Sequence, residues 1–411
     1  MFAPLASVRT LLLAIFVIMA GSGFLSTLVA VRLEAAGTSS LAIGLVAAAY
    51  FSGLMIGSLR APRLIARVGH IRSFAAFVSI FSASSLAYSI TMTAPFWGVL
   101  RLIDGFTMAG VFVCLESWLN RQADEKTRSS ILAAYMIALY GGQAIGQYLL
   151  NLGAARPSLP FVIAAILLSL SVLPVVLTKI EQPRLEAIEA FSMRQLYRAS
   201  PLGVVGTLTT GAILGAFYAL GAVFVQRLGM GLSQVALFTS CVIGGGVALQ
   251  WPLGLLSDRF DRRSVIVWCL LIVLAVSIVL SLFGEPGPQL FLLGALFGGF
   301  AFALYPLSVA HSNDHLSEEQ RIGASSGLVL AYSAGAVAGP LIASSTMQAI
   351  GTPGLFGTIA AMALGGATFA LWRTIVSAPV KMVNQQRFRI LPRTTPMAAV
   401  LEAEDEPGGQ V

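Results

Sequence analysis

Long apolar runs separated by short polar segments repeat along almost the whole chain. Each run has about 20 residues, the length at which an α-helix crosses the ~30 Å hydrocarbon core of a bilayer. The runs lack the two-residue alternation of transmembrane β-strands, so the pattern predicts helices. The twelve runs cover roughly residues 9 to 31, 40 to 61, 71 to 92, 96 to 118, 129 to 152, 158 to 178, 202 to 225, 233 to 256, 264 to 283, 289 to 311, 322 to 349 and 354 to 377.

The composition points to a membrane protein. Apolar residues make up 57% of the chain and charged residues only 10%, whereas soluble domains carry about 25% charged residues. The first run is long and is followed by a second span without a small-residue cleavage site, so we interpret it as a transmembrane helix and not a signal peptide. We therefore expect an all-α integral membrane protein with twelve transmembrane helices, a monomer in the lipid bilayer of the cell (inner) membrane.

Basic residues gather in alternate loops. The even-numbered loops and the two termini hold most of the 25 lysines and arginines, whereas the odd-numbered loops hold only Arg32, Arg156 and Arg227. The positive-inside rule therefore predicts that both termini lie in the cytoplasm. The same distribution explains the net charge of +7, so we expect no nucleic-acid partner.

Three echoes within the sequence indicate a duplicated six-helix unit. Their offsets are similar, whereas chance matches among glycine-rich helices would scatter. Glycines at these positions permit two helices to approach closely. The close approach serves ordinary helix packing or allows the helices to slide past each other. The matched positions are 62–71 with 254–263, Gly105 with Gly299, and the pair Gly142 and Gly146 with the pair Gly335 and Gly339.

Several short motifs carry a resemblance to a known family. GLLSDRFDRR at 254–263 resembles the cytoplasmic loop signature of the major facilitator superfamily, GxLaDrxGrr, and RLIDG at 101–105 resembles the family's span-four motif RxxxG of proton-coupled antiporters. ESWLN at 116–120 and HSND at 311–314 are similar to its YcaD-like branch. The first-half loop departs from the signature, because Ala66 stands in place of the acid and His70 in place of the first basic residue.

The resemblance implies two pseudo-symmetric six-helix bundles, at 1–178 and 202–377, with a substrate cavity between them near mid-membrane. The linker at 179–201 alternates charged and apolar residues, which favours an amphipathic helix on the membrane surface. The tail at 378–411 is predicted to be disordered and cytoplasmic. The residues expected to form a cytoplasmic gate are Arg67, Gly69, Glu116, Arg128, Asp258, Arg259, Arg262 and Arg263.

Three charged residues lie within or at the end of the fourth span. Arg101 and Asp104 are three residues apart on one helix face, and Glu116 returns to that face near the cytoplasmic end. Because a bare charge at bilayer depth costs about 2.5 to 3.5 kcal/mol on insertion scales, we expect the first two to face the bundle interior. They form a proton-coupling site, a static ion pair or a contact for a charged substrate. Glu116 is expected to be a gate or loop anchor that pairs with Arg67, Arg121 or Arg128.

Other polar and aromatic residues within the spans are candidates for the substrate cavity. Their mixture of amides and aromatics, with few acids, favours a neutral or weakly polar organic solute over a multivalent cation. His311 and Asp314, near the inner end of span ten, are candidates for proton transfer or for loop anchoring. The cavity candidates are Gln143, Gln147, Tyr218, Gln250, Trp251, Tyr305 and Tyr332.

The function predicted from these features is secondary active transport of a small organic solute by alternating access, as proton-coupled efflux. Proton-linked uptake of a sugar-like or organic-acid metabolite remains an alternative, as does a sensor that binds ligand without transport. An enzyme is not expected, because the sequence has only three histidines, at 70, 311 and 315, and neither a metal-binding nor a nucleophile motif. We expect no cofactor and no metal.

Overall fold

The computed structural model is almost entirely helical over the residues that it describes, which are 8–123, 127–154, 156–178, 192–376, 385–386, 388 and 393–395. This part of the chain contains no β-strand. The helices are α1 (Arg9–Ser22), α2 (Leu25–Ala35), α3 (Ser40–Val68), α4 (His70–Ala87), α5 (Ala94–Gln122), α6 (Arg128–Gly146), the 3-10 helix η1 (Gln147–Ala154), α7 (Leu159–Val176), α8 (Met193–Ala199), α9 (Pro201–Arg227), α10 (Leu232–Arg259), α11 (Arg262–Phe283), α12 (Pro288–Asn313), α13 (Glu318–Ile350) and α14 (Gly354–Val376).

Ten helical segments in the described part of the chain are long and apolar enough to cross a membrane. One of them, Arg9–Ala35, consists of α1 and α2 with an interruption at Gly23, a residue of low helix propensity. The two remaining predicted spans are α4 and α6. Both begin with polar residues that lower their hydropathy, and both pack against helices of the same bundle. The helices therefore match the twelve predicted runs to within several residues.

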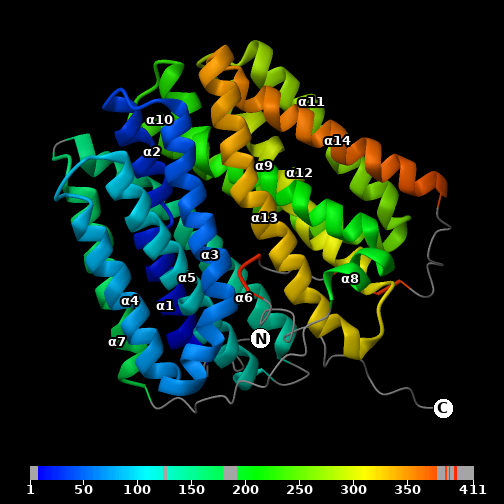
Figure 1. Cartoon of the computed structure of the whole chain (residues 1–411), viewed down its shortest axis with the longest axis horizontal. Helices are drawn as coiled ribbons and strands as arrows, with labels where there is room; N and C mark the ends of the chain where they lie inside the picture. The colour runs from blue at the N-terminus through cyan, green and yellow to red at the C-terminus, as the bar shows by residue number, and fades with distance from the viewer. Residues whose placement is uncertain are drawn as a thin grey trace.

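The two halves repeat the same helix pairings. In the first half α3 packs on α5, α1 on α6 and α4 on α7; in the second half α10 packs on α12, α9 on α13 and α11 on α14. Figure 1 shows the blue and cyan helices of the first half gathered on one side, with α13 running along the boundary between the halves. The prediction of two pseudo-symmetric bundles is confirmed.

Equivalent glycines bring equivalent backbones together in the two halves. A Cβ on Gly105 of α5 would overlap the carbonyl oxygen of Tyr50 on α3, and a Cβ on Gly298 of α12 would overlap that of Val242 on α10. The structural partner of Gly105 is thus Gly298 and not Gly299, which was predicted; Gly299 faces the side chain of Leu249. One residue along a helix turns the side chain by 100°, so only one of two adjacent glycines faces the neighbouring helix.

The second glycine echo agrees with the structure. Gly142 on α6 lies against the backbone of Phe16 on α1, and Gly335 on α13 lies against the backbone of Leu208 on α9. Gly146 and Gly339 repeat the arrangement one turn further along. These glycines therefore set the spacing of the helices that face the other half.

Only parts of the linker and tail are described. Residues 179–191 and most residues from 377 onward lie outside the described residues. Of the linker predicted to form an amphipathic helix, the structure describes the short helix α8, which packs on α9 and α13. The described residues of the tail contact the bundles. The ring of Phe388 packs on Gly254, and residues 393–395 lie between the two bundles, as detailed below.

Candidate functional site

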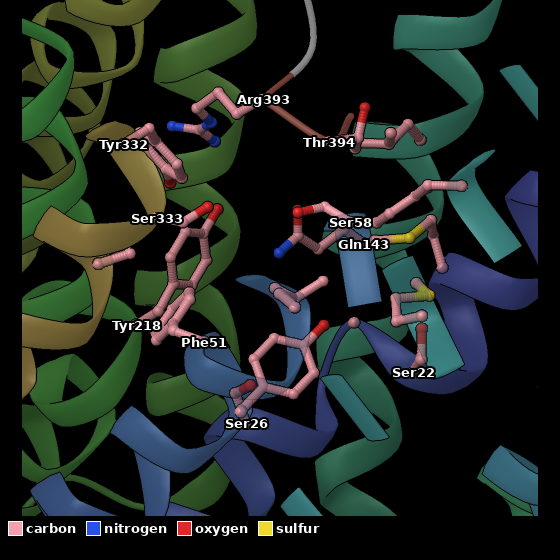
Figure 2. A pocket seen from close by; sticks show the side chains of 18 of the residues that line it. Ser22, Ser26, Phe51, Ser58, Gln143, Tyr218, Tyr332, Ser333, Arg393 and Thr394 are labelled. Atoms are coloured by element: carbon pink, nitrogen blue, oxygen red, sulfur yellow. The ribbon is translucent and has the colours of Figure 1, made fainter. Parts of the chain in front are cut away.

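A cavity lies between the two bundles, enclosed by α1, α2, α3, α5 and α6 of the first half and by α9 and α13 of the second. Figure 2 shows side chains from both halves and from the tail converging on it. Its lining combines hydroxyl and amide groups with aromatic rings, so it presents hydrogen-bonding groups within an otherwise apolar wall. The polar and aromatic lining residues are Ser22, Ser26, Tyr50, Phe51, Ser58, Phe112, Tyr140, Gln143, Tyr218, Tyr332, Ser333, Arg393 and Thr394.

One end of the cavity, which we call the gate end, is closed by polar contacts between the halves. Arg227 at the end of α9 donates to both carboxylate oxygens of Glu34 on α2, with Nε–Oε1 and Nη2–Oε2 distances of 2.6 and 2.9 Å. Arg227 also donates to Ser40 Oγ at 2.8 Å, and the Ser40 N–H donates to Gln348 Oε1 at 3.0 Å. Two parallel bonds from one guanidinium to one carboxylate fix geometry as well as charge. The pair therefore joins α2, α3, α9 and α13 at this end.

The predicted pair Arg101 and Asp104 is buried on α5 beside the cavity. Arg101 Nη1 lies 3.7 Å from Asp104 Oδ2, and Tyr88 Oη donates to the same oxygen at 2.6 Å. Asp104 is fully buried, and its Oδ1 has no hydrogen-bond partner within the described residues. A buried carboxylate oxygen without a partner is costly, so this oxygen can accept a further hydrogen bond.

Arg101 connects Asp104 to the cavity. Its Nη2 donates to Ser26 Oγ, and its Cζ lies 4.0 Å from the ring centroid of Tyr50. Ser26 and Tyr50 both line the cavity. A solute that contacts either of them therefore perturbs the guanidinium that stabilises the Asp104 carboxylate.

Glu116 lies near the C-terminal end of α5. We call this end of the cavity, opposite the gate end, the tail end. It is fully buried and accepts a hydrogen bond from Tyr135 Oη at 2.8 Å and further bonds from the hydroxyls of Thr394 and Thr395. Glu116 thus anchors the tail. Its predicted pairing with Arg67, Arg121 or Arg128 stays a prediction.

The other first-half residues that were predicted to form a cytoplasmic gate lie at the tail end, opposite the Glu34–Arg227 pair. Arg67 is exposed on the last turn of α3, and Arg128 is buried at the start of α6. Gly69 joins α3 to α4 with a φ of 94°, a conformation that side chains with a Cβ rarely adopt. This turn therefore explains why the loop carries glycine there.

In the second half the signature loop forms a buried ion-pair network. Arg262 is fully buried, with Nη2 3.3 Å from Asp258 Oδ1 and Nη1 2.6 Å from Asp314 Oδ2. Burial raises the pKa of Asp314, and the Arg262 guanidinium opposes that shift. Arg263 pairs with Asp261 at 2.9 Å, whereas Arg259 is exposed. The network orients the turn between α10 and α11.

The same network holds the described part of the tail. Arg262 Nη2 donates to the Gln386 carbonyl at 2.6 Å, and the Gln386 N–H donates to Asp314 Oδ1 at 2.9 Å. The Phe388 N–H donates to Asp258 Oδ1 at 2.7 Å. Asp314 is therefore a loop and tail anchor, one of the two roles expected for it.

The predicted cavity residues divide into three groups. Gln143, Tyr218 and Tyr332 line the cavity. Three others lie behind the wall: Gln147 donates to the Gly23 carbonyl at 3.1 Å, Gln250 is buried near the Phe302 carbonyl at 3.5 Å, and Tyr305 packs edge-on to Tyr332 with centroids 5.4 Å apart.

The prediction for Trp251 is wrong. Its side chain is 65% exposed on the outer surface of the bundle, where lipid would lie. Trp251 follows the buried Gln250 on α10, and one step along a helix rotates the side chain by 100°, away from the interior.

Sequence reasoning missed five aromatic residues of the site or its immediate surroundings, among them Phe112 on α5. Tyr140 lies three residues before Gln143 on α6, so helical periodicity places both on one face. Tyr50, Phe51 and Phe302 carry no comparable signal, because the apolar helices contain many aromatic residues.

The family of the chain follows from comparison with known proteins. The model of the Major Facilitator Superfamily matches residues 11–254 and 204–401, so the chain belongs to this superfamily of membrane transporters for small-molecule solutes. Proteins of Salmonella typhi and Salmonella paratyphi A, each named "Uncharacterized MFS-type transporter YcaD", are 30% identical to it over 345 and 352 residues. These matches cover 83% and 85% of this chain and 89% and 91% of the relatives. The predicted YcaD-like branch is confirmed.

Solved structures share the fold. The nucleoside transporter NupG superposes with a TM-score of 0.75 at 14% identity, covering 89% of this chain and 98% of its own. A bacterial homolog of the human lysosomal transporter Spinster gives 0.76 at 15% identity, covering 92% and 97%. At these identities the likeness shows the fold alone.

Proposed function

We propose that the protein is a proton-coupled secondary transporter that exports a small organic solute by alternating access. In this proposal the halves at 1–178 and 202–377 rock against each other around the central cavity. The observation that carries the proposal is the position of Asp104, fully buried with one unpartnered oxygen and joined through Arg101 to the cavity wall.

The orientation in the membrane follows from the loop charges. The positive-inside rule places the tail end in the cytoplasm, so the gate end with Glu34 and Arg227 faces outward. On this assignment the bidentate ion pair closes the cavity on the outside.

The proposed coupling uses the network around Asp104. A proton on its carboxyl group removes the attraction to Arg101, which is then held at the cavity by Ser26 and the ring of Tyr50. A solute bound against these residues competes for the guanidinium and changes the proton affinity of Asp104 in turn. Opposite movement of proton and solute results if the two bind in alternation.

Flux across a membrane tests this function. The full-length protein, reconstituted in liposomes with an inward or outward pH gradient, would be screened against organic cations, sugars, organic acids and nucleosides. Export predicts solute movement against the proton gradient, whereas movement with the protons would establish the uptake alternative. Binding without flux of any bound solute would establish a sensor.

A matched pair of variants isolates the coupling site. Asp104→Asn should abolish pH-driven flux while leaving solute exchange between the two sides of the membrane. Glu285→Gln, which changes an exposed carboxyl group in a loop, should leave both unchanged. Full pH-driven flux in Asp104→Asn would overturn the coupling role.

A further inference from the structure

The guanidinium of Arg393 lies in a cage of aromatic rings at the tail end of the cavity. Its Cζ is 4.3 Å from the ring centroid of Phe302, 5.8 Å from Tyr332 and 5.9 Å from Tyr140. Its Nη2 donates to Tyr140 Oη at 3.2 Å. Figure 2 shows Arg393 entering beside Tyr332. The negative faces of aromatic rings attract a cation within about 6 Å, most strongly away from water, so the cage has the chemistry of a cation site.

The described residues that line the cavity include no carboxylate. The charge of Arg393 is therefore met at the cage by ring faces and a hydroxyl group, which suit a weakly hydrated cation such as guanidinium. A divalent metal ion would require several oxygen ligands. The Nη1 of Arg393 is buried without a hydrogen-bond partner among the described residues, so Arg393 fills the cage incompletely.

The tail that carries Arg393 is attached to both halves. Thr394 and Thr395 donate to Glu116 on α5 of the first half. Gln386 and Phe388 bond to the ion-pair network around Arg262 in the second half. These contacts hold the Arg393 segment at the mouth of the cavity, so it competes with a soluble ligand as a tethered group, at an effective concentration of order millimolar.

We propose that the cage of Tyr140, Phe302 and Tyr332 is the binding site for a monovalent organic cation, a guanidinium or substituted ammonium compound, and that Arg393 is a tethered competitor for it. The inference names a substrate class for the proposed transporter. Only the claim that the cation is transported rests on the proposed function, because binding to the cage is measured separately. It replaces the neutral solute expected from the sequence. A solute cation displaces Arg393 and thereby loosens the tail contacts, at Glu116 and around Arg262, that link the two halves.

Binding to the purified full-length protein in detergent tests the cage. The probes, each with its α-amino group acetylated, are L-argininamide, then a monovalent guanidinium cation, and citrullinamide, its neutral analogue of the same shape. Both are titrated by calorimetry into wild type and Arg393→Gln. We expect Arg393→Gln to lower the Kd for L-argininamide about tenfold or more, because a competent site is no longer occupied. Arg373→Gln removes an arginine that lies 5.7 Å from the Trp372 ring outside the cavity, and should leave the Kd unchanged.

Further variants separate the cage from the tail. Phe302→Leu in the Arg393→Gln background should reverse the gain, and Arg393→Lys should retain most of the competition. Melting temperatures within a few degrees of wild type would show that each variant is folded. Equal affinity for citrullinamide, or no gain in folded Arg393→Gln, would overturn the inference.

The result also separates this inference from the proposed transport. Cation binding with the expected variant pattern, but no flux in liposomes, would leave the cage assigned and reject the transport cycle. Proton-driven flux of a neutral solute, with no cation binding in Arg393→Gln, would support transport and reject the cation cage.

Discussion

Glu34 and Arg227 lie 193 residues apart in the chain, the offset that relates the two halves, and meet as a bidentate ion pair with distances of 2.6 and 2.9 Å. Equivalent positions near a pseudo-twofold axis face each other across it, so opposite charges placed there bind one half to the other. The duplication thus supplies the geometry of the gate, and divergence of the two copies supplies its charge.

Breaking this pair should open the gate end. The side chains of Glu34 and Arg227 are 17% and 25% exposed. We therefore expect Arg227→Gln to shift the equilibrium between the closed and open states of the gate end by about 1 kcal/mol, roughly fivefold. The measurement is labelling of Ser333→Cys, in the cavity wall, by an impermeant maleimide added outside, with Cys114, Cys241 and Cys269 replaced. The exchange Glu34→Arg with Arg227→Glu should restore slow labelling; unchanged labelling in Arg227→Gln would contradict the gate.

Loss of Arg101 should destabilise the protein more than loss of the charge on Asp104. Arg101→Leu leaves a fully buried carboxylate without its cation, a change that costs about 3 to 5 kcal/mol when a buried pair is broken on one side. Asp104→Asn removes the acid and keeps its shape, so its melting temperature in detergent should fall less. A reversed order would show that Arg101 carries the larger desolvation cost.

Two glycines of α5, about two turns apart, should respond oppositely to alanine. Gly105→Ala places a methyl group into the Tyr50 carbonyl of α3, and overpacking costs typically about 1 to 3 kcal/mol. Gly98→Ala meets no atom closer than 4.0 Å and gains helix propensity, so it should be neutral or stabilising. Thermal melting of the two variants tests this prediction. Equal melting temperatures would contradict the close contact between α5 and α3.

The tail should be released by a change in the second-half loop. Arg262→Gln removes the guanidinium that bonds Asp258, Asp314 and the Gln386 carbonyl. In a cysteine-free background carrying Thr395→Cys, whose site is 1% exposed, we expect maleimide labelling to accelerate about tenfold. The exposed neighbour Arg259→Gln should leave the rate near that of the parent, and equal acceleration would show a general loosening of the loop.

The hydrophobic pattern determined the helices and their approximate ends, and the recurring motifs indicated the duplication. Lipid requires every spanning segment to satisfy its own backbone, so about 20 apolar residues have essentially one solution as a span. The pattern also identified Arg101 and Asp104, because charges inside such a span must face the bundle interior.

Contacts between distant segments were decided only by the tertiary structure. Gln250 and Trp251 are adjacent and both plausible from sequence, but helix rotation buries one and exposes the other. The composition of the tail predicts disorder, yet the described residues 393–395 find partners in Glu116 and the aromatic cage, which lie more than 60 residues away in the chain. Local pattern fixes which segments form helices in lipid; the rotation of each helix and the destination of a polar tail depend on packing against the other half.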